Sequence, residues 1–127
     1  MSFLTFSAIG QEWRDSLEVA RKAYKAQDYD KALRYYKSAQ AKAPENIDFS
    51  DEIGQSTYRS LDFENAEKVY QQKASSEVDS KARARSYHNL GNTRMEKKDY
   101  NGAIDAYKES LRNNPNDTET RYNLSEA

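Results

Sequence analysis

A chain of 127 residues is long enough for one domain and leaves no room for a separate catalytic module. Its 20 basic and 21 acidic residues give a formal net charge of −1, so it lacks the basic surface that binding to a nucleic-acid backbone requires. Four glycines, two prolines and no cysteine favour a helix-rich protein and exclude disulfides and zinc–thiolate sites. No apolar run approaches the roughly 18 residues of a membrane-spanning helix.

Residues 1–12 form an N-terminal segment with two open interpretations. The stretch from Phe3 to Gly10 is apolar and ends in Ala8-x-Gly10, the small-x-small pattern that precedes signal-peptide cleavage. A basic region before it is missing, and the apolar part is short. The segment is therefore either the remnant of a secretory signal or a hydrophobic staple that packs on the first helix.

The rest of the chain is dominated by an internal repeat. One pattern occurs three times: Asp28-Tyr29-x-x-Ala32-x-x-x-Tyr36, Asp62-Phe63-x-x-Ala66-x-x-x-Tyr70 and Asp99-Tyr100-x-x-Ala103-x-x-x-Tyr107. A small residue also stands twelve positions before each alanine, at Ala20, Gly54 and Gly91. Small residues at these places predict helices that cross closely, and the aromatic series predicts core packing rather than a cofactor site.

These residues resemble the tetratricopeptide repeat, a 34-residue helix-turn-helix unit. The repeats are framed as residues 13–46, 47–80 and 84–117, with Lys81 to Arg83 as an insertion and 118–127 opening a fourth unit. The resemblance implies an all-α fold, a right-handed α-solenoid of antiparallel helix pairs over residues 13–127. Tyr87, Leu90 and Gly91 match the family pattern, whereas Lys98 stands where a turn glycine is usual.

Proline and capping residues predict where the helices end. Pro44 and Pro115 cannot continue a helix, so each marks a break between repeats. Asn116 or Asp117 can cap a short seventh helix that begins near Thr118. The middle repeat has the weakest signals and is expected to be the most loosely packed.

The resemblance also implies a binding groove lined by the first helix of each repeat. In the first repeat the groove positions are Arg14, Leu17, Glu18, Arg21, Tyr24 and Lys25. In the second they are Asp48, Asp51, Glu52, Gln55, Tyr58 and Arg59. In the third they are Arg85, His88, Asn89, Asn92, Met95 and Glu96. The predicted groove runs from basic to acidic to mixed, which would orient a peptide of opposite charge order. Ordinary solvated helix faces are the alternative.

Two asparagines occupy places by which family members often grip a peptide backbone, Asn92 and Asn123. An amide side chain suits that role because it supplies both a donor and an acceptor. One branch of the family uses a clamp of basic and amide side chains to hold a C-terminal carboxylate. This chain departs from the clamp at Leu17, Arg21 and Glu52, so the sequence argues against carboxylate capture by that set.

The sequence offers little to catalysis, and we expect no enzyme activity and no cofactor. His88 is the only histidine, and the four glycines form no phosphate-binding loop. Asp48, Asp51 and Glu52 have helical spacing, but carboxylates near a helix start are favoured by the helix dipole without any metal ion. We therefore expect no metal site.

The expected partner is a protein or a peptide. A second resemblance, carried by residues 87–92, 113–117 and 119–124, is to exported repeat proteins of bacterial aerotolerance operons, which have membrane partners with von Willebrand A-type domains. It implies a periplasmic protein in a membrane-associated complex, whereas the cytoplasm is the default compartment without a signal. The alternative function is a structural one, self-association or docking within a larger protein, with Tyr122 and Leu124 too few to cover the C-terminal end.

Overall fold

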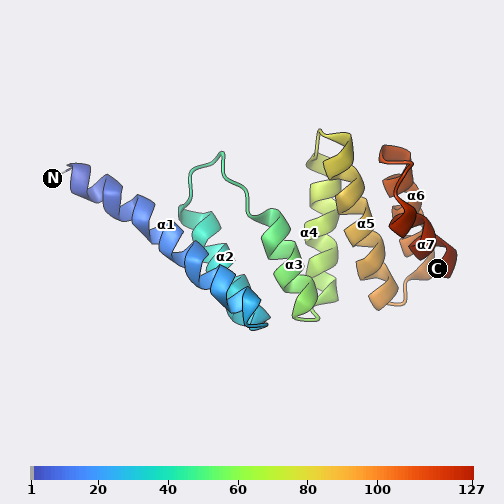
Figure 1. The fold of residues 1–127 in the computed structure, drawn as a ribbon, viewed down its shortest axis with the longest axis horizontal. Helices are drawn as coiled ribbons and strands as arrows, with labels where there is room; N and C mark the ends of the chain where they lie inside the picture. Colours follow the sequence, from blue (N-terminus) through green and yellow to red (C-terminus); the bar gives the residue numbers. More distant parts are fainter. Residues whose placement is uncertain (1) are drawn as a thin grey trace. The chain divides into compact units, whose positions relative to one another are not determined.

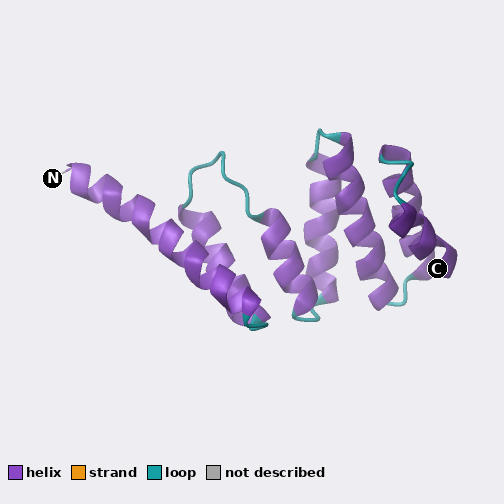
Figure 2. Cartoon of the chain, viewed as in Figure 1, coloured by secondary structure: helices purple, strands orange, loops and turns teal. Residues whose placement is uncertain are grey.

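The computed structural model describes residues 2–127, with side chains from Gly10 onward, and this part of the chain contains seven helices and no strand (Figures 1 and 2). The helices are α1 (Ser2–Lys25), α2 (Tyr29–Lys42), α3 (Ser50–Arg59), α4 (Phe63–Ser76), α5 (Ser80–Glu96), α6 (Tyr100–Asn113) and α7 (Thr118–Glu126). They form two compact units, unit 1 over residues 1–61 and unit 2 over residues 62–127. The boundary falls inside the repeat predicted at 47–80.

The same local structure precedes the second helix of each predicted repeat. Asp28, Asp62 and Asp99 each accept a hydrogen bond from the backbone N–H three residues on, and so cap α2, α4 and α6. The residues just before them, Gln27, Leu61 and Lys98, have φ values of 63°, 67° and 63°. This left-handed conformation is the one that glycine adopts with least strain. The recurring aspartate of the repeat pattern is therefore a helix cap.

The helix ends agree with the sequence signals. Helices α2 and α6 end two residues before Pro44 and Pro115, as predicted. Helix α7 begins at Thr118 and is capped by Asp117, whose carboxylate accepts from the Thr120 N–H. The three-residue insertion at 81–83 lies within α5 and lengthens that helix.

The N-terminal segment joins the first helix without a break. From Ser2 onward its backbone belongs to α1, which therefore begins well before residue 13. The side chains from Phe3 to Ile9 lie outside the described residues, so both interpretations of this segment stay predictions.

Small residues allow close helix packing in both units, as the repeat pattern predicted. In unit 1, Ala20 and Ala32 are fully buried in a core that also contains Leu17, Tyr36 and Phe49. In unit 2, a Cβ added to Gly91 would lie 2.5 Å from Tyr107 Cδ1, so only glycine lets α5 and α6 approach this closely. The predicted all-α fold of consecutive helix pairs is confirmed.

Candidate functional site

Two cavities of unit 1 share lining residues, and a single face of α1 lines the larger of this pair. The cavity has a volume of about 780 Å³ and is lined by Trp13, Arg14, Leu17, Glu18, Arg21, Lys22, Tyr24, Lys25 and Tyr36. Residues three or four apart share a helix face, which is why the α1 positions gather here. All six groove positions predicted for the first repeat belong to this lining.

Three lining residues were not among the predicted groove positions. Trp13 and Lys22 lie on α1 beside predicted residues, and their spacing from Leu17 and Glu18, four residues in each case, was the signal that could have found them. Tyr36 was expected only in the core. It is 5 % exposed and forms part of the cavity floor, so one ring serves both roles.

The larger cavity has an apolar floor and a cationic rim. Leu17 and Tyr36 are buried, while Arg14, Arg21 and Lys25 are exposed. Lys22 Nζ lies 3.2 Å from the Glu18 carboxylate. Arg21 and Lys25 make no hydrogen bond or ion pair with any side chain that the structure describes. Their charges are thus available to an anionic group of a ligand.

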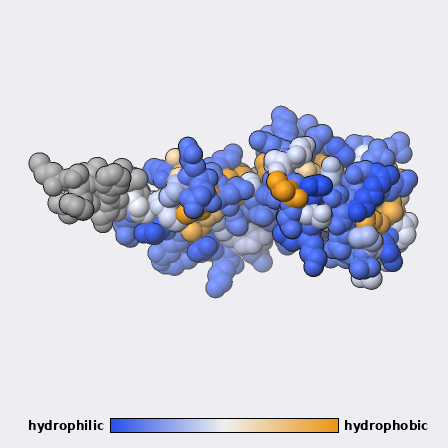
Figure 3. Space-filling view, turned by 90° about the horizontal axis from the view of Figure 1, so that it is seen from above, coloured by the Kyte–Doolittle hydropathy of each residue, from blue (hydrophilic) through white to orange (hydrophobic). Residues whose placement is uncertain are grey.

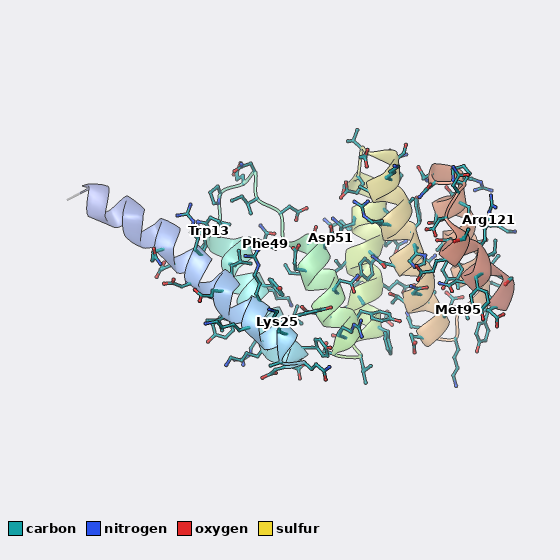
Figure 4. All side chains as sticks on the ribbon, in the orientation of Figure 1. Trp13, Lys25, Phe49, Asp51, Met95 and Arg121 are labelled. Carbon is teal, nitrogen blue, oxygen red and sulfur yellow. The ribbon has the colours of Figure 1, made fainter. Side chains whose placement is uncertain are left out.

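The smaller cavity, about 170 Å³, is lined by Tyr24, Tyr36, Asp51, Glu52 and Gln55. Because Tyr24 and Tyr36 line both cavities, the two adjoin, and together they form what we call the unit 1 groove. The acidic residues of the groove lie on α3, and Gln40 holds the segment that leads into this helix. Its side chain donates to the Ile47 carbonyl at 2.8 Å and accepts from the Phe49 N–H at 2.5 Å. The ring of Phe49 packs against Trp13 with centroids 6.2 Å apart (Figure 4).

Other predicted positions of the second repeat lie outside this groove. The Asp48 carboxylate accepts from the backbone N–H and the hydroxyl of Ser50, each at 2.9 Å, and so supports the start of α3. Tyr58 is half-buried and Arg59 is exposed, and neither lines the two cavities.

Burial perturbs two ionisable groups of the unit 1 groove. It raises the pKa of the Glu52 carboxyl, and the charges of Asp51 and Asp48 act in the same direction, while the backbone N–H of Glu52 and, to a smaller extent, Arg21 oppose the change. Burial also raises the pKa of the Tyr36 hydroxyl, to which the Glu52 charge adds. Perturbed groups in a cavity are a common mark of a functional site.

In unit 2 the predicted groove positions are joined by internal hydrogen bonds. The Asn92 carbonyl oxygen accepts from the Tyr107 hydroxyl at 2.6 Å and from the Asn123 amide at 3.1 Å. The Asn92 amide nitrogen lies 3.2 Å from His88 Nε2, and His88 Nδ1 lies 2.7 Å from Thr120 Oγ1. Both asparagines expected to grip a peptide are thus engaged within the protein.

The network also assigns the histidine tautomer. Thr120 Oγ1 donates its one hydrogen to Asp117 Oδ2 at 2.7 Å, so it accepts from Nδ1–H of His88. Nε2 is then the acceptor for Asn92. Burial raises the pKa of Asp117, but the hydrogen bonds from the Thr120 side chain and backbone outweigh it and hold that pKa below its ordinary value.

The remaining predicted positions of unit 2 differ in their exposure. Arg85 and Glu96 are exposed, Met95 is half-buried, and the Asn89 carbonyl accepts from Thr93 Oγ1 at 2.8 Å. Within the described residues, no cluster of three or more histidine, aspartate or glutamate side chains could hold a metal ion. None of the described helices is both long and apolar enough to cross a membrane.

Helix pairs with small crossing residues, capped by a repeated aspartate, define a helical repeat protein. Family models of the tetratricopeptide repeat match residues 17–77 and 84–117. The chain belongs to the tetratricopeptide repeat family.

Solved structures of this family have the same fold. The N-terminal domain of stress-induced protein-1 from C. elegans has a TM-score of 0.75 at 21% identity, over 94% of this chain and 96% of that one. The first such domain of Spaghetti (RPAP3), bound to the HSP90 peptide SRMEEVD, has a TM-score of 0.74 at 22% identity, over 91% and 90%. The Sgt2 domain from Aspergillus fumigatus has a TM-score of 0.73 at 20% identity, over 91% and 76%. A search of curated proteins found no match.

Proposed function

We propose that this protein is a non-enzymatic interaction scaffold whose unit 1 groove binds an extended peptide of a partner protein. The observation that carries the proposal is the pair of adjoining cavities, whose floor is apolar and whose rim carries cations without internal partners. A buried apolar floor with a few polar groups at the edge suits side-chain recognition. Two similar structures are complexes, the RPAP3 domain with the HSP90 peptide SRMEEVD and the TPR2AB domain of yeast Sti1 with pHSP90.

The proposed mode of binding differs from a carboxylate clamp. Leu17 and Arg21 stand at clamp positions, and Glu52 adds a negative charge where a C-terminal carboxylate would be repelled. The groove is instead basic over the larger cavity and acidic over the smaller one. A peptide with an acidic residue toward Arg21 and Lys25 and an apolar residue over Leu17 matches this surface.

The test is a selection of random displayed peptides on the intact chain, followed by affinity measurements on variants. Arg21→Glu should weaken a selected peptide about tenfold or more and reduce the salt dependence of binding. Lys37→Glu makes the same charge change at an exposed site on α2 that lines neither cavity, and it should bind like the parent. If Lys37→Glu weakens binding as much as Arg21→Glu does, the groove is not the site.

A structural role remains the second candidate. Tyr122 on α7 is 65 % exposed, an aromatic side chain that another copy of the chain could cover. Light scattering across a dilution series, repeated with Tyr122→Ser, tests this candidate, because self-association must depend on concentration.

The membrane-associated complex implied by the aerotolerance resemblance stays a prediction. The face shown in Figure 3 is mostly hydrophilic with small, separate hydrophobic patches.

A further inference from the structure

The smaller cavity of the unit 1 groove combines aromatic walls with hydrogen-bond acceptors. Two tyrosines, Tyr24 and Tyr36, come from α1 and α2, and Asp51, Glu52 and Gln55 come from α3. At about 170 Å³ the cavity has room for the end of one side chain. The phenol rings and the negative charges both favour a positive group over an anion or a neutral apolar one.

One acceptor in this cavity lacks a hydrogen-bond partner in the protein. Glu52 Oε2 is buried and receives no hydrogen bond from any described residue. Leaving a buried carboxylate oxygen without a donor is costly, so such an atom calls for a reason. Burial raises the pKa of Glu52 more than its own backbone N–H and the nearby Arg21 lower it. Arg21 lies near enough to oppose that shift but forms no ion pair with Glu52.

A donor with positive charge would complete this arrangement. The ammonium of lysine or the guanidinium of arginine carries several N–H donors on a flexible alkyl stem. Such a group could donate to Glu52 Oε2 while its stem and charge lie against the rings of Tyr24 and Tyr36. Arg21 and Lys25 in the adjoining cavity would at the same time repel a cation from the larger cavity.

We propose that the smaller cavity is a cation subsite, in which Glu52 pairs with the terminal ammonium or guanidinium of a lysine or arginine side chain in the bound peptide. The proposal rests on the peptide-binding function proposed above and specifies its ligand. The peptide carries one basic residue for the smaller cavity and an acidic residue for Arg21, in an order set by the groove.

The test uses three small probes with the isotope-labelled intact chain: Nα-acetyl-lysine amide, Nα-acetyl-arginine amide and the uncharged Nα-acetyl-norleucine amide. In an NMR titration, the lysine and arginine probes should shift the signals of Gln55 and Glu52 and lower the apparent pKa of Glu52. The norleucine probe should bind about tenfold more weakly, because it lacks the charge-assisted hydrogen bond. Comparing the first two probes shows whether lysine or arginine is preferred.

Two variants control for non-specific attraction. Glu52→Gln keeps the shape of the side chain and should remove the preference for the charged probes. Glu12→Gln, which removes an exposed carboxylate of α1 that lines neither cavity, should retain it. Equal binding of norleucine and lysine probes, or an unchanged preference in Glu52→Gln, overturns the subsite. Failure of the peptide-binding function would instead appear as unweakened peptide binding by Arg21→Glu, whatever the small probes do.

Discussion

In unit 1 the side chains of Arg21 and Lys25 and one oxygen of Glu52 make no hydrogen bond or ion pair with described residues. In unit 2, by contrast, His88 and Asn92 are hydrogen-bonded to α6 and α7. The comparison is close, because Gln55 of unit 1 and Asn92 of unit 2 occupy the same place in successive repeats. The same repeat position therefore lines a cavity in one unit and belongs to a hydrogen-bond network in the other.

The two units also differ in their ion pairs. In unit 2, Glu67 joins Arg94 at 2.9 Å and Lys97 at 2.8 Å, which connects α4 to α5. These hydrogen bonds outweigh the effect of burial and lower the pKa of Glu67, with the bond from Lys97 the largest influence. In unit 1, Lys22 beside the groove forms an ion pair with Glu18, and both residues lie on the same helix, α1. Charge in unit 2 holds helices together, whereas charge in unit 1 faces the cavities.

The largest expected effect concerns the packing of unit 2. Gly91→Leu forces a side chain into the ring of Tyr107 and should lower the free energy of unfolding by about 2–3 kcal/mol or more. Chemical denaturation measures this change in the free energy of unfolding. Lys98→Gly is the control on the same helix pair, since Lys98 has φ 63° and glycine relieves that strain. It should be neutral or slightly stabilising, and equal unfolding midpoints for Gly91→Leu and the parent would refute the helix crossing.

The next prediction compares the loss of stability when either of two matched amide side chains, Asn92 of unit 2 or Gln55 of unit 1, is removed. Asn92→Ala removes the acceptor of the Tyr107 hydroxyl and of the Asn123 amide, and the amide beside His88 Nε2, and should cost about 1–3 kcal/mol of stability. Gln55→Ala removes an amide that makes no side-chain hydrogen bond within the described residues, so its cost should stay within about 0.5 kcal/mol. Denaturation of both variants checks the difference. A larger loss for Gln55→Ala would reverse the roles assigned to the two units.

The smallest predicted effects are changes in stability with pH, and they have opposite sign for Asp117 and Glu52. Asp117 has a folded-state pKa below its ordinary 3.8, so its contribution is present above that value and is lost as pH falls through the folded pKa. Asp117→Ala should therefore cost about 1 kcal/mol at neutral pH and less in acid. Glu52 has a folded-state pKa above its ordinary 4.5, so its contribution is greatest below 4.5 and is lost as pH rises through the folded pKa.

Glu52→Gln should accordingly be more stable than the parent at neutral pH, by roughly 0.5–1 kcal/mol, and lose this advantage in acid. Urea unfolding from neutral to acidic pH measures both variants. Such a gain is the expected sign of a residue kept for binding at some expense of stability. Parallel pH profiles for the two variants would contradict the contrast between the units.

The fold could be predicted from the sequence because its signals are local and repeated. Alanine, glycine and tyrosine recur in phase, and Pro44 and Pro115 mark helix ends that the structure confirms. The role of the recurring aspartate was missed, although a cap before an aromatic residue at the same place in three repeats was a readable signal. The insertion at 81–83 could not be placed from its position alone, since it joined a helix instead of a loop.

The candidate site was predictable in part. Helical spacing brings the α1 residues to one face, and that face lines the larger cavity. Spacing could not show whether an amide on such a face is free, because the partners of Asn92 come from α5, α6 and α7. Nor could it show that Tyr36, a core residue, also borders both cavities. These properties depend on side-chain contacts between helices.

The most direct test of the central claim is an NMR map of the isotope-labelled intact chain with a peptide selected on it. The largest chemical-shift changes are expected in unit 1, around Leu17, Arg21, Tyr24 and Glu52. Changes centred instead on His88, Asn92 and Asn123, with the unit 1 groove unaffected, would contradict it.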